Sequence, residues 1–366
     1  MLILKFHYKF DNIKPLHSLH AVINAIVIKY ILNNRKGLLR RINMSFEVKH
    51  LQKKFGEKQA VEDLSFQLQN PGVYALLGTN GAGKSTSIRM MLGILARDNG
   101  EVLFNGTNFD TRRVNVGYLA EERGLYPKYP IMDQLLYFAS LKGLSQDDAM
   151  EKIKYWGDRL KVNEYLFPER KKGKKFKPTL ADQLSKGNQQ KIQLMAALIS
   201  DPQFLILDEP LSGLDPVNTD LFKSVIREEI DKNKYIIMSS HQMPVIEEFC
   251  SDITILNRGK AVVSGNLNEI KKSYGRVNLF VKCDEDISDL ITKLGIKVIN
   301  DTPAGIHLRV SSEIEAKSLL KELSDSNKTI VRFELREPSL HEIFIESVGE
   351  NAENNTSSKA EETVGE

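Results

Sequence analysis

The segment from Val73 to Leu95 constrains the fold more than any other part of the chain. The short apolar run Val73–Leu77 is typical of a buried strand, and the glycine-rich loop Gly78–Ser85 follows it directly. Thr86–Leu95 then has the pattern of a helix. A strand, a loop of the form G-x-x-x-x-G-K-S and a helix in this order predict an α/β fold whose loop binds a nucleoside triphosphate.

Each residue type in this loop suits phosphate binding. The glycines allow successive backbone N–H groups to point into one concavity, and the helix that begins near Lys84 adds the positive end of its dipole. We expect Lys84 to reach the β- and γ-phosphates and Ser85 to bind Mg²⁺. A glycine-rich turn without function is the alternative, but the register of strand, loop and helix argues against it. The expected nucleotide-binding residues here are Gly78, Thr79, Asn80, Gly81, Ala82, Gly83, Lys84, Ser85 and Thr86.

A second strand is expected to end in two adjacent carboxylates. The apolar run Phe204–Leu207 predicts a buried strand, and Asp208 and Glu209 follow at its tip. Asp208 is placed to hold Mg²⁺, and Glu209 is placed to polarise the attacking water. Two acids at a solvated strand end would be an even alternative in isolation. The phosphate loop upstream favours the catalytic interpretation.

From about Ser45 to Lys271 the chain resembles the ATP-binding subunits of ABC transporters. The segment Leu184–Asn188 is similar to the signature turn of that family, and Ser212–Asp215 is similar to its D-loop. The resemblance implies a P-loop NTPase of the ABC cassette type, with a helical subdomain that carries the signature. It also implies ATP and Mg²⁺ as cofactors and ATP hydrolysis coupled to transport.

The same resemblance assigns roles to residues whose type alone indicates little. His241 matches the switch histidine, and Phe55 stands where the family stacks an aromatic ring on adenine. Ser185 and the backbone of Gly187 would bind the γ-phosphate of ATP held by a second cassette, so we expect a dimer. The D-loop residue Asp215 completes the nucleotide-binding set. The expected catalytic residues are Lys84, Glu209 and His241.

Three positions depart from the family's usual residues. Lys186 replaces a Gly and Asn188 replaces a Gln in the signature turn. Glu121 stands where the family usually has a Gln whose amide oxygen contacts Mg²⁺, and a carboxylate can also ligate this ion. The alternative is that Glu121 points away and that Glu122, or nothing, takes its place. The expected metal ligands are Ser85, Asp208 and Glu121.

The sequence pattern divides the chain into regions. We expect a cassette over residues 44–275, and alternating strand-like and helical segments predict a small C-terminal α+β domain over residues 276–348. Residues 349–366 are rich in Glu, Asn, Ser and Thr without an apolar period, which predicts a disordered tail. With this appendage the chain is similar to bacterial export ATPases, including sodium-extrusion cassettes.

The net charge of +3 hides an uneven distribution. Residues 1–43 hold eight Lys or Arg and one acid, whereas the remainder holds 43 basic and 47 acidic residues. A nucleic-acid partner is therefore not expected. We expect residues 1–43 to be translated upstream sequence and Met44 to be the native start, because Arg40 and Arg41 can be encoded by a ribosome-binding purine run. A membrane-surface helix is the alternative for this leader.

No run after Met44 has the length and apolarity of a transmembrane helix, so a membrane role requires a partner. The resemblance implies a separate integral-membrane permease and a location at the cytoplasmic face of the membrane. The basic segment 170–177 would contact lipid headgroups or an acidic permease loop there, or it is simply a solvated loop.

Other classes of ABC protein fit the chain less well. Translation factors of this type usually carry two cassettes, and DNA-repair members have long insertions, whereas this chain has one phosphate loop and no such insertion. A cassette that binds ATP without hydrolysing it is disfavoured by the presence of Glu209 and His241.

Overall fold

The computed structural model describes residues 45–122, 124–169 and 177–348. The expected leader, the expected tail and all but the last residue of the basic segment 170–177 lie outside these ranges. The elements up to residue 198 are β1 (Phe46–Phe55), β2 (Lys58–Leu68), β3 (Gly72–Leu77), α2 (Lys84–Met91), β4 (Asn99–Phe104), β5 (Thr107–Asn108), β6 (Val116–Leu119), α3 (Ile131–Leu141), α4 (Gln146–Leu160), α5 (Asn163–Leu166), a 3-10 turn (Ala181–Gln183) and α6 (Lys186–Leu198).

The remaining elements complete the cassette and form a second, smaller sheet. In chain order they are β7 (Phe204–Asp208), α7 (Pro216–Asp231), β8 (Tyr235–Ser240), α8 (Met243–Phe249), β9 (Asp252–Asn257), β10 (Lys260–Asn266), α9 (Leu267–Ser273), β11 (Asn278–Cys283), α10 (Ser288–Lys293), β12 (Lys297–Thr302), β13 (Gly305–Arg309), α11 (Glu313–Asp325) and β14 (Ile330–Arg336). Helical backbone over residues 340–348 follows, and we call it the C-terminal helix.

The cassette is built on a ten-stranded sheet in the order β5-β4-β1-β2-β10-β9-β3-β8-β7-β6. Strands β3, β8, β7 and β6 are mutually parallel, and the first three are almost entirely buried. Burial on both faces explains why these strands are continuous apolar runs in the sequence. Because they are parallel, their carboxyl ends meet at one edge, where the phosphate loop and Asp208 both lie.

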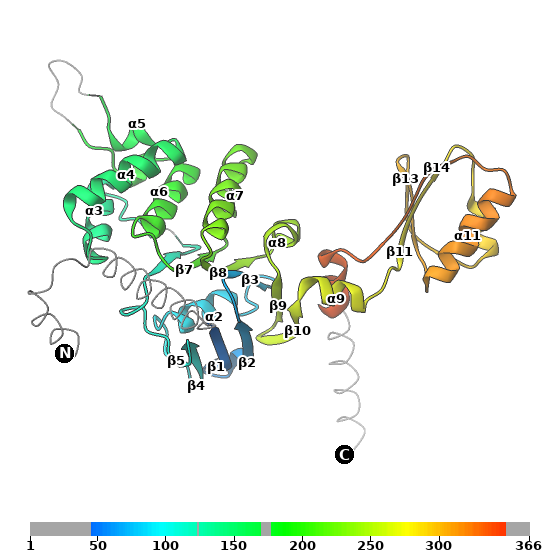
Figure 1. Cartoon of the computed structure of the whole chain (residues 1–366), viewed down its shortest axis with the longest axis horizontal. Coiled ribbons are helices and arrows are strands. Elements are labelled where there is room, and N and C mark those ends of the chain that lie inside the picture. Colours follow the sequence, from blue (N-terminus) through cyan, green and yellow to red (C-terminus); the bar gives the residue numbers. More distant parts are fainter. Residues whose placement is uncertain (1–44, 123, 170–176, 349–366) are drawn as a thin grey trace, which may run out of the picture. The chain divides into compact units, whose positions relative to one another are not determined.

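Helices α3, α4 and α5 form a group that precedes α6 in the chain (Figure 1). The helical period predicts a buried face, and Leu135, Ile153, Trp156 and Leu160 are buried in the main hydrophobic cluster. Leu141, which the same period places on that face, is 66% exposed because α3 ends at this residue.

The helix after the phosphate loop is shorter than the sequence predicts. It ends at Met91 rather than Leu95, because Gly93 adopts a left-handed conformation with φ of 70°. The N–H of Ile94 donates to the carbonyl of Arg89 at 2.9 Å, and the N–H of Gly93 donates to the carbonyl of Met90 at 3.1 Å. These two bonds form a Schellman motif, which terminates the helix.

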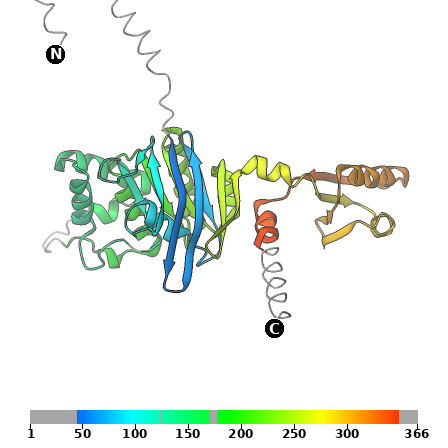
Figure 2. The same ribbon diagram turned by 90° about the horizontal axis from the view of Figure 1, so that it is seen from below.

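The second sheet has the order β12-β13-β11-β14, and each neighbouring pair is antiparallel. With α10 and α11 it forms a β-α-β-β-α-β unit of ferredoxin-like topology, which confirms a small α+β domain. Figure 2 shows α11 along one face of this sheet. A separate hydrophobic cluster lies between the helices and that face, and it includes Leu279, Val281, Leu308, Leu319 and Leu323.

The C-terminal helix packs with the cassette rather than with this second cluster. Leu340, Ile343 and Phe344 are buried in the main hydrophobic cluster, to which Leu267 of α9 also belongs. The chain therefore leaves the cassette after α9, forms the α+β domain, and returns to the cassette through its last helix (Figure 1).

Candidate functional site

The loop between β3 and α2 has a backbone that only glycine allows at its turning points. Gly83 has φ of 109°, and a Cβ atom there would lie 2.5 Å from the carbonyl oxygen of Ala60. Gly78 has φ of 154°, and its Cβ would lie 2.5 Å from the carbonyl oxygen of Leu256. The loop thus packs tightly against β2 and β9, and its backbone shape is fixed by its neighbours.

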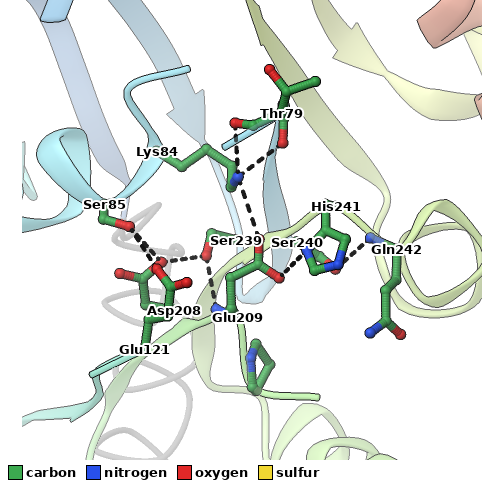
Figure 3. Close-up of polar contacts among 12 residues, drawn as sticks. Thr79, Lys84, Ser85, Glu121, Asp208, Glu209, Ser239, Ser240, His241 and Gln242 are labelled. Carbon is green, nitrogen blue, oxygen red and sulfur yellow. Dashed lines mark hydrogen bonds and ion pairs between the residues drawn. The ribbon is translucent and has the colours of Figure 1, made fainter. Parts of the chain in front are cut away.

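Lys84 is buried at the base of this loop, with 6% of its surface exposed. Its Nζ donates to the carbonyl oxygen of Gly78 at 2.8 Å and to that of Thr79 at 3.3 Å. It also lies 3.3 Å from Oε1 of Glu209, with which it forms an ion pair (Figure 3). The ammonium group is therefore held between the phosphate loop and the end of β7.

Ser85 and two carboxylates lie together beside Lys84. The Ser85 hydroxyl is 3.2 Å from Oδ1 of Asp208 and 3.5 Å from Oε2 of Glu121 (Figure 3). The other carboxylate oxygen of Asp208 is buried and has no hydrogen-bond partner within the described residues. Mg²⁺ prefers hard oxygen ligands, and a buried oxygen without a hydrogen-bond partner is free to bind it. These three residues therefore fit the metal site that the sequence predicts.

Burial shapes the electrostatics of Asp208. The residue is 1% exposed, and desolvation raises the pKa of its carboxyl above the ordinary value. Hydrogen bonds from Ser239 and Ser85 act in the opposite direction and lower this pKa, whereas the nearby charge of Glu209 raises it further. A cation at the orphaned oxygen would relieve this desolvation.

Glu209 follows in a strained backbone conformation. Its φ is 49°, in the left-handed region that a non-glycine residue rarely adopts, and its N–H donates to the Ser239 hydroxyl at 2.9 Å. Its Oε2 lies 2.8 Å from Nδ1 of His241, which is half-exposed at the end of β8. The turn therefore aims the carboxylate between Lys84 and the histidine, where it can accept a proton from a bound water.

A groove of about 290 Å³ runs along this side of the loop. Phe55, at the end of β1, is 49% exposed at its rim, and Lys58 lines it as well. The other lining residues are Ala60, Asn80, Gly81, Ala82, Gly83, Lys84, Ser85, Thr86 and Glu121. Among the described residues the groove therefore unites Phe55 with most of the predicted phosphate-binding residues.

The predicted signature residues lie outside the lining of this groove. Ser185 caps the N-terminus of α6, where its hydroxyl accepts from the N–H of Asn188 at 3.3 Å. Asp215 caps α7 by accepting from the N–H of Asn218 at 2.9 Å, a bond that lowers the pKa of its carboxyl. A Cβ at Gly187 would lie 3.1 Å from Nδ2 of Asn218, so the two helix starts are neighbours.

The structure adds Ser239, which the sequence analysis does not identify, and it distinguishes Glu121 from Glu122. The Ser239 hydroxyl donates to Asp208 and accepts from the N–H of Glu209, so it fixes both acids. Glu122 pairs with Arg89 at 3.3 Å, whereas Glu121 faces Ser85. The position of Ser239 at the carboxyl end of β8, beside the predicted strand that carries Asp208, is a signal that could have identified it.

Three features lie at the ends of the parallel strands: a buried lysine at a glycine-rich loop, a cluster of oxygen atoms suited to a metal ion, and a Glu–His pair. Together they define a P-loop nucleotide hydrolase. Comparison with known proteins makes this class specific. The family described as ABC transporter matches residues 61–212, and the family described as ATP-binding protein DrrA1-3-like, C-terminal domain, matches residues 265–348.

Full-length relatives agree with these matches. The chain is 41% identical over 303 residues to the uncharacterized ABC transporter ATP-binding protein YhaQ of Bacillus subtilis, which covers 82% of this chain and 98% of the relative. It is 26% identical to the linearmycin resistance ATP-binding protein LnrL of the same organism, over 83% of this chain and 98% of the relative.

A solved structure of the ATP-binding subunit of an ABC transporter also superimposes on this chain. Its TM-score is 0.55 at 26% identity, over 63% of this chain and 93% of the other. The chain belongs to the family of ABC transporter ATP-binding proteins, and it is an ATPase that binds nucleotide. Within residues 45–122, 124–169 and 177–348, no helix has the length and apolarity needed to cross a membrane.

Proposed function

We propose that this chain is the energy-coupling subunit of an ABC exporter, which binds Mg-ATP at an interface between two cassettes and drives a separate membrane permease. The observation that carries the proposal is the Lys84–Glu209–His241 cluster beside the unsatisfied oxygen of Asp208. It brings a phosphate-binding cation, a base and a metal ligand within a few ångströms of one another.

Each residue of the cluster has a distinct role in hydrolysis. Lys84 exchanges its contacts with loop carbonyls for contacts with the β- and γ-phosphates, and the loop amides bind the remaining oxygens. Ser85, Asp208 and Glu121 would hold Mg²⁺, and the bound ion would supply positive charge that neutralises the phosphates. Glu209 orients the attacking water and accepts its proton, while His241 fixes the carboxylate through its Nδ1.

A second cassette completes the site, whether it is another copy or a different chain. Ser185 and Gly187 lie at the N-terminus of a thirteen-residue helix, so backbone N–H groups and the helix dipole are available for an anion there. Because these residues do not line the groove of their own chain, we place them against ATP held by the partner cassette.

The permease contact is proposed for an aromatic hollow just beyond Glu121. Tyr126, Tyr129 and Tyr137 are each more than half exposed and, with Asp133 and Gln134, line a hollow of about 420 Å³. Exposed clustered tyrosines are typical of protein interfaces. The occupant that we propose is a cytoplasmic helix of the permease. Only four residues separate Tyr126 from Glu121, so a helix seated there would be linked to the metal side of the site.

Substitution of Glu209 tests the catalytic half of the proposal. Glu209→Gln should still bind ATP but hydrolyse it at least about a hundredfold more slowly, since the base is lost. The variant should also accumulate as an ATP-dependent dimer, measured by light scattering with Mg-ATP. Lys84→Ala should neither bind nor dimerise, and the exposed Glu101→Gln serves as the control. A Glu209→Gln rate near that of the wild type would refute the assignment.

Recovery from membranes tests the transport half. Affinity purification of the full chain from detergent-solubilised membranes should yield an integral-membrane protein in stoichiometric amount. Tyr129→Ala together with Tyr137→Ala should reduce that yield without changing nucleotide binding. Recovery of ribosomes or nucleic acid in place of a membrane protein would contradict the proposal.

A further inference from the structure

His241 directly follows β8, and helix α8 begins two residues after it, so both elements position the histidine. The N–H of Gln242 donates to the Ser240 hydroxyl at 2.9 Å, and the N–H of Val245 donates to the carbonyl of Gln242 at 3.1 Å. A helix of seven residues has little stability of its own, because nucleation is costly. Its place must therefore be fixed by contacts with other elements.

One acidic residue of α8 receives two such contacts from later parts of the chain. Oε1 of Glu247 lies 2.7 Å from Nζ of Lys271 on α9, and it accepts the N–H of Leu340 at 2.7 Å. Both Glu247 and Lys271 are about three-quarters buried. A single carboxylate on α8 thus joins α9 and the start of the C-terminal helix.

The bond to Leu340 satisfies a helix terminus that local capping leaves open. Ser339 and Glu342 form a capping box: the N–H of Glu342 donates to the Ser339 hydroxyl at 3.3 Å, and the N–H of Ser339 donates to Oε2 of Glu342 at 2.7 Å. The N–H of Leu340 lies between them and takes Glu247 as its acceptor. An anion at a helix N-terminus is also favoured by the helix dipole.

The α+β domain contacts two further polar residues of the C-terminal helix, Glu342 and Glu346. Nδ2 of Asn278, the first residue of β11, donates to Oε1 of Glu342 at 2.7 Å. Arg309 of β13 lies 3.5 Å from Glu346 and donates to Oδ1 of Asn278 at 3.0 Å. A continuous set of contacts therefore runs from the small sheet through the C-terminal helix and Glu247 to α8.

We propose that Glu247 is a positioning residue for ATP hydrolysis, which holds α8 and His241 in place through the C-terminal helix. The α+β domain thereby acts on the reaction through contacts of this chain alone. The inference rests on the proposed role of His241 beside Glu209. It predicts that loss of the Glu247 contacts slows the chemical step and leaves the nucleotide-binding groove unchanged.

Variants of two adjacent glutamates test this role in the full-length chain. Glu247→Ala should lower kcat for ATP hydrolysis about fivefold while KM stays within about twofold, because small displacements of a catalytic group affect turnover more than binding. Glu247→Gln keeps an acceptor for the Leu340 N–H and should lose only about twofold. Glu248→Ala is the comparison on the same helix, because its similarly buried carboxylate ties α8 to Lys223 at 2.7 Å and to Arg227, both on α7, and not to the C-terminal helix. It should therefore lower kcat less than Glu247→Ala does.

The possible results distinguish a positioning role of Glu247 from a general loss of stability and from an error in the role proposed for His241. Rates are compared below the lowest Tm of the set, and Glu247→Gln carries the test if Glu247→Ala does not fold. An unchanged kcat in either foldable Glu247 variant, or an equal loss in Glu248→Ala, would overturn the inference. His241→Ala is measured alongside: if it retains the wild-type rate, the proposed role of His241 fails instead.

Discussion

Replacement of Glu121 by Gln gives the sharpest test of the metal site, because the substitution restores the residue usual in the family while removing one charge. Oε2 of Glu121 lies 3.5 Å from the Ser85 hydroxyl, and Oδ1 of Asp208 lies 3.2 Å from the same hydroxyl. In the wild type, two carboxylates therefore face the expected position of Mg²⁺. Without the ion, the Glu121 charge should repel the γ-phosphate.

The expected magnitude follows from Coulomb's law at this separation. Two unit charges on the order of 4 Å apart interact by ~1 kcal/mol in water, and a divalent ion doubles this to about 2 kcal/mol. Glu121 is exposed, so solvent and salt keep the interaction near this lower limit. A difference of about 2 kcal/mol corresponds to roughly thirtyfold in affinity. Because salt screens an exposed charge further, we expect the Mg²⁺ dependence of nucleotide affinity to fall by about tenfold.

Equilibrium binding of a non-hydrolysable ATP analogue, measured in EDTA and in saturating Mg²⁺, gives this dependence as a ratio of two dissociation constants. Glu121→Gln should bind the analogue more tightly than the wild type in EDTA and gain less from Mg²⁺. Glu122→Gln removes the same charge at the next residue, where the carboxylate pairs with Arg89, and should leave the ratio unchanged. Equal ratios in the wild type and Glu121→Gln would refute direct ligation, and equal shifts in both variants would indicate only a long-range charge effect.

Two further predictions concern adenine and buried charge. Phe55→Ala should weaken ATP binding about threefold to tenfold by loss of ring stacking, with no change for inorganic tripolyphosphate and with recovery in Phe55→Trp; equal losses for both ligands would contradict stacking. Asp208→Asn should abolish Mg²⁺-dependent hydrolysis yet raise the Tm at neutral pH by ~2–4 °C, or about 1 kcal/mol. The reason is that the carboxylate is buried and one of its oxygens has no hydrogen-bond partner among the described residues. Burial raises the pKa of Asp208 in the folded state, so ionisation of this carboxyl destabilises the fold as pH rises above 3.8. The Tm difference between Asp208→Asn and the wild type should therefore grow from acid to neutral pH. A difference that does not change with pH would show that the buried charge is not its cause.

The sequence predicted the central strands and the phosphate loop because local signals and tertiary environment agree there. Strands β3, β7 and β8 are buried on both faces, so their apolar runs are unambiguous. The loop at Gly78–Ser85 requires glycine for its backbone, and the same residues form the motif. In such segments the residue type and the structural demand coincide.

Strand β12 shows where this agreement ends. Residues 297–301 are all exposed, because β12 is an edge strand that pairs with β13 alone among the described elements. Val298 and Ile299 are adjacent and about half exposed, so no alternation of apolar and polar residues marks a buried face. The strand is specified by its partner's backbone, which a reading of local periodicity does not detect.

The site divides along the same line. Lys84, Ser85, Asp208 and Glu209 could be predicted from the sequence because each occupies a fixed place after a strand. Ser239 depends on tertiary structure, because it reaches Asp208 through the pairing of β8 with β7. The role of Glu247 is even harder to predict from local sequence, because its two partners lie 24 and 93 positions later in the chain. Residues that act on substrate lie in short sequence motifs. The residues that hold them in place come close to them only through tertiary packing. For this reason the sequence pattern assigns the C-terminal helix to the α+β domain, whereas in the structure this helix packs with the cassette and contacts α8, the helix that follows His241.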